Sequence, residues 1–152
     1  MSIFQNDVTH FVKKLQQAGK DRRKVIEDSL IGIRREIVST SVTDTCRAVL
    51  KLLNIYIYGQ DISWATFSMI SLSAHPKLQF KRVGYLGLNL TIHLAKELIP
   101  LVINSIMKDL NSMNSHFTIV SMNSLAFFID EAVAPNVASE ISTHITSTNP
   151  QI

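Results

Sequence analysis

The sequence contains a single cysteine, Cys46, which excludes an internal disulfide framework and a cysteine-based zinc site. Charged residues are also scarce, at 18% of the chain against a usual ~25%, whereas hydrophobic residues make up 46%. Despite this, no charge-free run reaches the ~18 apolar residues that a membrane-spanning helix needs. The nearest, residues 83–95, is too short and ends at Lys96. We therefore expect a cytosolic protein with more apolar surface than one small domain usually shows.

Positive charge is missing from the last part of the chain. All 15 Lys and Arg residues lie within residues 1–110, where nine carboxylates leave a net charge of +6. Residues 111–152 carry three carboxylates and no Lys or Arg. A basic N-terminal part is compatible with nucleic acid, with an anionic membrane or with an acidic partner, and equally with a solvated helix face.

The alternating pattern of β-strands is absent, and helical periodicity runs almost throughout. We expect about eight helices joined by short polar links. The second begins near Asp21, a candidate N-cap, and the third ends before Gly59. The last has Pro135 in its first turn. The expected helices lie near residues 8–15, 22–37, 46–57, 63–72, within 77–114 (two helices), 115–128 and 132–145.

The helices of the second half are spaced as a repeat. Similar links end two successive helix pairs at residues 110–112 and 145–147, and Phe80 and Phe117 stand at their starts. A pair spacing of ~35–45 residues is typical of HEAT and armadillo arrays, so the sequence predicts an all-α, right-handed superhelical solenoid. Gly84 and Gly87 lie inside an expected helix, where each costs up to ~1 kcal/mol relative to alanine, so close helix packing is expected there. We expect residues 1–152 to form a single helical-repeat region that starts a longer solenoid.

The sequence gives no sign of catalytic chemistry, of a metal site or of a cofactor. The five histidines are far apart in the chain, and no phosphate-binding or dinucleotide-binding glycine motif occurs. No residue is assigned as catalytic or metal-binding, and we expect a protein that is not an enzyme.

Basic residues form the candidate binding sites. Arg47 and Lys51 are four residues apart and share one helix face. A second basic group spreads over the two preceding helices and their turn: Lys13, Lys14, Lys20, Arg22, Arg23, Lys24, Arg34 and Arg35. The two groups could merge if the second and third helices packed side by side. Non-adjacent cations of this kind suit a phosphorylated lipid headgroup, and they favour lipid over nucleic acid. Lys81 and Arg82 form a further basic pair inside a helix.

Several motifs in order resemble the N-terminal trunk of the adaptins, the large subunits of heterotetrameric adaptor complexes. They are Arg47-Ala-Val-Leu-Lys51-Leu-Leu, Tyr58-Gly-Gln-Asp61, Lys81-Arg82-Val-Gly84-Tyr85-Leu86 and Asn104-x3-Lys108-Asp109-Leu110-x-Ser112. The likeness extends from about Phe11 to Ile152. The segment Asp61-Ile-Ser-Trp64-Ala-x-Phe67 is most similar to the delta type, and residues 97–114 are somewhat similar to the epsilon type.

This resemblance implies a non-enzymatic α-solenoid acting in protein transport between Golgi or endosomes and the lysosome or vacuole. The implied partners are a sigma-type small subunit, a beta-type large subunit, a mu-type medium subunit, anionic membrane lipids and an Arf-type GTPase, with no nucleic acid. The implied location is cytoplasmic, peripheral on Golgi and endosomal membranes and coated vesicles.

The resemblance also carries residue assignments. In the family, basic residues at the start of the third helix contact phosphoinositide, and Arg47 and Lys51 fall on two of those positions. A basic residue late in the first helix helps to bind dileucine sorting signals, and Gln16 stands there in this sequence, which leaves signal binding unassigned. The rival interpretation is a free-standing HEAT-repeat scaffold that binds protein or RNA.

Overall fold

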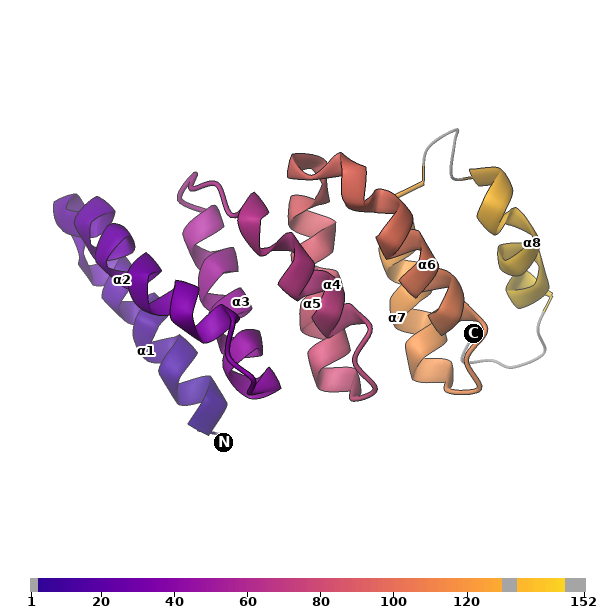
Figure 1. Ribbon diagram of the computed structural model, residues 1–152, viewed down its shortest axis with the longest axis horizontal. Coiled ribbons are helices and arrows are strands. Elements are labelled where there is room, and N and C mark those ends of the chain that lie inside the picture. The colour runs from indigo at the N-terminus through magenta and orange to yellow at the C-terminus, as the bar shows by residue number, and fades with distance from the viewer. Residues whose placement is uncertain (1–2, 130–133, 147–152) are drawn as a thin grey trace.

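The computed structural model describes residues 3–129 and 134–146, and this part of the chain consists of helices joined by turns and loops, without a strand. Eight α-helices follow one another in an elongated row (Figure 1). Their bounds are α1 Ile3–Gln17, α2 Arg22–Ile37, α3 Val42–Tyr56, α4 Thr66–Ser73, α5 Leu78–Thr91, α6 Ile99–Leu110, α7 Ser115–Leu125 and α8 Ala134–Ile145. Four 3-10 turns connect them: Gly19–Asp21, Ser63–Ala65, Ile92–Leu94 and Lys96–Leu98.

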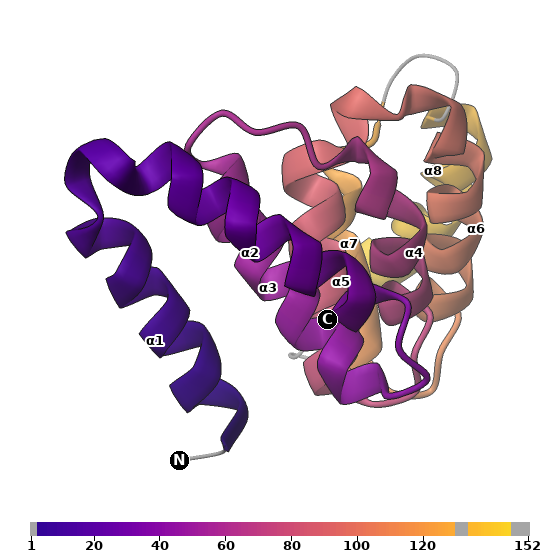
Figure 2. The same ribbon diagram turned by 60° about the vertical axis from the view of Figure 1, so that its left-hand side comes forward.

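The helices form two layers. One contains α2, α4 and α6, and the other contains α1, α3, α5 and α7 (Figures 1 and 2). The closest contacts between the layers join α2 to α3, α4 to α5 and α6 to α7. The core runs through the stack as one continuous apolar cluster, from Phe11 and Leu15 in α1 to Val137 in α8. The predicted all-α solenoid is confirmed.

The pairing of the helices differs from the prediction in phase. The sequence favoured a pair within residues 77–114, which are α5 and α6. Instead α5 packs most extensively on α4, and α6 packs on α7, while α5 and α6 touch little. The link between α5 and α6 is long because two 3-10 turns, Ile92–Leu94 and Lys96–Leu98, separate them. The predicted repeat length agrees with the structure, but the closest pairs are α4 with α5 and α6 with α7, each one helix earlier in the chain than the predicted pairs.

Capping residues explain where several helices begin and end. The Ser41 side chain accepts a hydrogen bond from the Asp44 N–H at the start of α3, and Asn114 accepts one from His116 at the start of α7. Gly59 has φ +85° after α3, as the predicted stop requires. Asp21 does occupy the N-cap position of α2, but its side chain makes no capping hydrogen bond there.

Gly84 is the point of closest helix approach. A Cβ atom on Gly84 would lie 2.2 Å from the Ser73 backbone nitrogen and 2.7 Å from the Leu72 carbonyl carbon, so α4 leaves no room for a side chain. At Gly87 a Cβ atom would meet the Met69 side chain instead, with Sδ at 2.8 Å. The close packing that was expected from the two glycines is therefore present, and it joins α5 to α4.

Candidate functional site: the basic residues

Lys51 lies inside the junction of three helices. Its residue is only 7% exposed, and Nζ is 2.8 Å from an Asp7 carboxylate oxygen of α1 and 3.0 Å from Glu36 Oε2 of α2. Desolvation lowers the pKa of Lys51, but the hydrogen bonds and negative charges of Asp7 and Glu36 outweigh it, and the pKa is raised overall. Lys51 is thus a charged residue that ties α1 and α2 to α3.

Arg47 occupies a half-buried position one turn earlier in α3. One of its guanidinium nitrogens pairs with the Asp44 carboxylate, three residues before it. The Arg47 Nε–H is buried and has no hydrogen-bond partner among the described residues. Arg47 and Lys51 therefore share a helix face, as predicted, but each is already paired with a carboxylate.

Three residues of the second basic group lie at the other end of the same helix pair. Arg22 donates from Nε to the Leu15 carbonyl at 3.0 Å, and its guanidinium lies 4.7 Å from the centroid of the Tyr58 ring. Arg23 pairs with Glu27 on the exposed face of α2. A shallow groove here is lined by Arg22, Arg23, Ile26, Tyr58 and Gln60. Lys24 is exposed.

The two basic groups do not merge as a whole. Because α2 and α3 are antiparallel, the start of α2 meets the end of α3, whereas Glu36 near the end of α2 meets Lys51. Residues 22 and 36 are 14 positions apart, which is ~21 Å along a helix at 1.5 Å per residue. Arg22, Arg23 and Lys24 are therefore far from Arg47 and Lys51, and these five residues do not form one merged cationic group. Arg34 and Arg35 lie in the last turn of α2, near Glu36, at the end of the helix closer to Lys51.

Lys81 is part of a buried polar network, although its neighbour Arg82 is exposed. Lys81 is 2% exposed and Asp109 5%, and Lys81 Nζ donates to both Asp109 carboxylate oxygens at 2.7 and 2.9 Å. Nζ also donates to the Ser73 carbonyl, and the Tyr85 hydroxyl donates to Asp109 at 2.7 Å. Burial, followed by the bond to Asp109, raises the pKa of Tyr85. The network joins α4, α5 and α6.

The burial of Lys81 and Asp109 could have been predicted from the helical periodicity of the sequence. Lys81 shares a helical stripe with Tyr85 and Leu88, and Asp109 shares one with Val102 and Ile106. Charged residues at such positions are expected to be buried in pairs. Of this pair, Lys81 is therefore a buried structural residue, and Arg82 is a surface residue.

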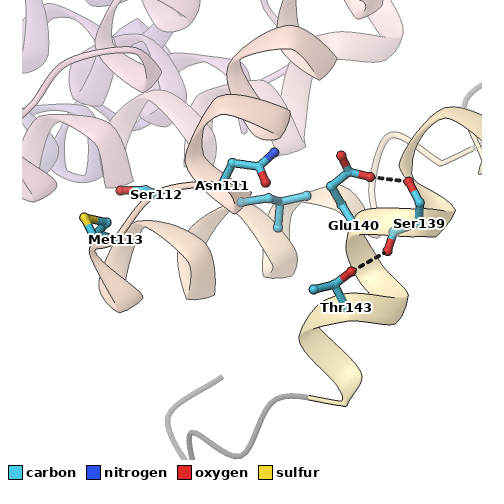
Figure 3. Close-up of a pocket in the computed structure, with 7 residues that line it drawn as sticks. Asn111, Ser112, Met113, Ser139, Glu140 and Thr143 are labelled. Carbon is cyan, nitrogen blue, oxygen red and sulfur yellow. Dashed lines mark hydrogen bonds between the residues drawn. The ribbon is translucent and has the colours of Figure 1, made fainter.

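Figure 3 shows a pocket where the turn between α6 and α7 faces α8. Its lining residues are Leu110, Asn111, Ser112, Met113, Ser139, Glu140 and Thr143. Thr143 Oγ1 donates to the Ser139 carbonyl at 3.0 Å, and the Ser139 hydroxyl donates to Glu140. Glu140 is the one charged residue of this lining, so the pocket offers neither an acid–base pair nor an anion site.

Gln16, at the position that the family resemblance links to sorting signals, is exposed on α1. The neighbouring groove between α1 and α2 is lined by His10, Lys13, Lys14, Gln17, Ala18, Asp21 and Val25. Among the described residues, no helix is both long and apolar enough to cross a bilayer.

Comparison with known proteins places these features in a family. The model of the adaptin N terminal region matches residues 22–152. The chain is 31% identical to the AP-3 complex subunit delta-1 of Bos taurus over 150 residues, which cover 99% of this chain and 12% of that protein. It is 26% identical to the AP-3 complex subunit delta of Saccharomyces cerevisiae, over 99% of this chain and 17% of that protein.

An AP-1 subunit is also similar. The AP-1 complex subunit gamma of Dictyostelium discoideum is 28% identical over 100% of this chain and 17% of its own length. The chain thus spans less than a fifth of the length of each of these relatives. By its helical repeat, its ordered motifs and the family match over residues 22–152, the chain belongs to the adaptin family, whose N-terminal region it represents.

Proposed function

We propose that this chain is part of the non-enzymatic large subunit of a heterotetrameric vesicle-coat adaptor complex of the delta-like type. Its role is protein transport between Golgi or endosomes and the lysosome or vacuole. The likeness to AP-3 delta subunits over 99% of the chain carries the proposal. The chain acts through assembly with sigma-, beta- and mu-type subunits and through recruitment to the cytoplasmic face of these membranes, where an Arf-type GTPase contributes.

The outer surface of α5 supports the assembly role. Leu86 and Leu90 are exposed one turn apart on this helix, and the exposed Phe127 follows α7, the next helix of the same layer. No Lys, Arg, Asp or Glu occurs in residues 83–95 or 111–129. Exposed apolar side chains in segments without charge suit contact with another subunit.

Co-expression with a sigma-type small subunit tests the proposed assembly. We expect a stable complex with the unmodified chain and a clearly weaker one with the Leu86→Ser/Leu90→Ser variant. Ile31→Ser is the matched control, because Ile31 is exposed on α2, in the other layer of helices. Failure of every form to assemble, with the fold intact by circular dichroism, would contradict the proposed function.

We further propose that Arg47 and Lys51 contact phosphoinositide, supported at a distance by Arg22, Arg23 and Lys24. The resemblance of Arg47 and Lys51 to family positions supports this, as does the unpartnered Nε–H of Arg47. Because Asp7 and Glu36 hold Lys51, a phosphate must compete with two carboxylates for its ammonium group. Reversal of the Lys51 charge is a poor test, since it would place three carboxylates together and disrupt the junction.

Two milder variants test the phosphoinositide contact. Arg47→Gln should weaken binding to vesicles that contain phosphoinositide, whereas Asp7→Asn should strengthen it by removing one of the two carboxylates that hold Lys51. Unchanged binding in both variants would remove these residues from the site. Binding to RNA in place of vesicles would favour the rival role as a free-standing scaffold.

A further inference from the structure

The pocket between the end of α6 and α8 contains a negative charge without a counter-charge (Figure 3). Glu140 of α8 is half-buried in the lining, and it forms no ion pair within the part of the chain that the structure describes. Residues 111–152 contain no Lys or Arg, and Lys108, the last such residue of the chain, does not line the pocket. The pocket therefore attracts a cation and repels an anion.

The hydrogen-bond donors of the lining are largely used inside the protein. Asn111 Nδ2 donates to the Met107 carbonyl at 3.1 Å. On α8, the Ser139 hydroxyl donates to Glu140, and Thr143 Oγ1 donates to the Ser139 carbonyl at 3.0 Å. The acceptors are different, because Asn111 Oδ1, Glu140 Oε1 and Thr143 Oγ1 accept no hydrogen bond from the described residues. The pocket thus suits a ligand that donates hydrogen bonds.

The end of α6 adds to the negative potential of the pocket. Leu110, the last residue of α6, lines it together with the three residues that follow. A helix C-terminus carries about half an elementary negative charge and favours cations. The N-terminus of α7 begins in the same turn, but Asn114 caps it by accepting a hydrogen bond from the His116 N–H, and no residue of α7 lines the pocket.

Apolar surface lies beside these acceptors. Leu110 is buried, whereas Met113 is fully exposed in the turn between α6 and α7. Lys and Arg side chains bury their aliphatic stems along apolar surface while the charged head reaches polar groups. Figure 3 shows Asn111 and Glu140 on opposite sides of the pocket, whose volume of about 440 Å³ lies within the usual range for ligand pockets. A long basic side chain therefore matches both the size and the chemistry of the lining.

A divalent metal ion matches the lining less well. Calcium takes six to eight oxygen ligands, several of them carboxylates, whereas Glu140 is the one carboxylate here. A single carboxylate surrounded by neutral acceptors instead suits an ammonium or guanidinium group, which brings several N–H donors of its own.

We propose that this pocket holds a Lys or Arg side chain from a basic segment of a protein partner. Glu140 pairs with the charged head, Asn111 Oδ1 and the Thr143 hydroxyl accept further hydrogen bonds, and Leu110 and Met113 contact the aliphatic stem. The pocket is separate from the basic residues of α2 and α3 and from the outer surface of α5. It therefore adds a contact for a partner of opposite charge to the one that those basic residues select.

NMR titration of the full chain tests the pocket. The probes are two capped Gly-Ser peptides that differ only at the central residue, which is Arg in one and Gln in the other. We expect the Arg peptide alone to shift the amide resonances of Asn111, Glu140 and Thr143. Glu140→Gln keeps the shape of the side chain but removes its charge, and it should raise the Kd of the Arg peptide at least ~tenfold through loss of a charge-assisted hydrogen bond.

Glu97→Gln is the matched control, because it removes the same charge from the turn before α6, at the other end of that helix. It should leave the Kd of the Arg peptide nearly unchanged. A second variant, Asn111→Ala, leaves the net charge unaltered and should weaken binding less than Glu140→Gln does. Circular dichroism checks that each variant is folded.

Equal losses in the Glu140 and Glu97 variants would mean that only net charge matters and would overturn the proposal. Equal binding of the Arg and Gln peptides would overturn it too, as would resonance shifts confined to residues outside the pocket. Spermine is the remaining probe. If it bound more tightly than the Arg peptide and shifted the same resonances, the pocket would belong to a free polyamine and not to a protein segment.

Discussion

Lys81 and Arg82 are adjacent in the chain and carry the same charge, yet they occupy opposite environments. Lys81 is buried against Asp109 and the Ser73 carbonyl, whereas Arg82 points to solvent. A helix rotates by about 100° per residue, so the phase of α5 alone decides which cation is structural. Mutation of Lys81 and mutation of Arg82 should therefore have different effects on stability, although both side chains are cationic.

Substitution of Lys81 should be far more damaging than substitution of Arg82. Lys81→Met leaves the buried Asp109 without a cation and should lower the free energy of unfolding by about 3 kcal/mol. Arg82→Met should change it by no more than ~0.5 kcal/mol. Urea denaturation measures both. The Lys81→Met/Asp109→Leu double variant should be more stable than Lys81→Met, and equal effects at residues 81 and 82 would refute the network's role.

Cys46 should be chemically inert until the protein unfolds. The residue is 1% exposed, and burial raises the pKa of its thiol to about 11. At about pH 8, near the ordinary thiol pKa, we expect a thiol reagent to react only when urea unfolds the chain. Rapid labelling of the folded protein would contradict this.

The same shift makes a prediction about alkaline stability. A folded-state pKa above that of the unfolded state favours folding while the thiol is protonated in both states. That contribution is lost as the pH rises from about 8.5 to about 11. The raised pKa values of Lys51 and Tyr85 act in the same direction. The free energy of unfolding should therefore fall over this range, and less steeply in Cys46→Ala than in the unmodified chain.

At the scale of the helices, two glycines inside helices should respond to alanine with opposite signs. Gly84→Ala forces a Cβ atom into the α4 backbone and should destabilise the protein by about 3 kcal/mol. Gly32 lies inside α2, where an added Cβ meets nothing within 4 Å, so Gly32→Ala should stabilise by ~0.5–1 kcal/mol. Thermal unfolding compares the two, and destabilisation by both would indicate a general intolerance of alanine.

The helices could be predicted from the sequence because each depends on local periodicity and on end signals such as Asp21, Gly59 and Pro135. Gly84 and Gly87 even indicated a close approach. The helix they approach could not be predicted, because the Gly84–Ser73 contact depends on how α4 folds back on α5. The two carboxylates that pair with Lys51 could not be predicted for the same reason, since Glu36 and Asp7 are distant from it in the chain. The sequence thus identified Arg47 and Lys51 as candidate binding residues, but it could not show that both are already paired with carboxylates.

At the scale of the molecule, stability should vary along the row of helices. The closest packing joins α4 and α5 near the middle, whereas α8 packs chiefly on α6. Solenoid helices depend mainly on their nearest neighbours. Amide hydrogen exchange should therefore be slowest in α4 and α5 and fastest in α8. Uniform protection along the chain would show a single cooperative unit instead.

The ion pair between Lys81 and Asp109 closes over only 28 residues. During synthesis on a ribosome, little more than one further helix must follow α5 before Lys81 can pair with Asp109. The helices of this chain can therefore fold one after another as they leave the ribosome. Nascent α5 should need protection from aggregation only until Asp109 has left the exit tunnel.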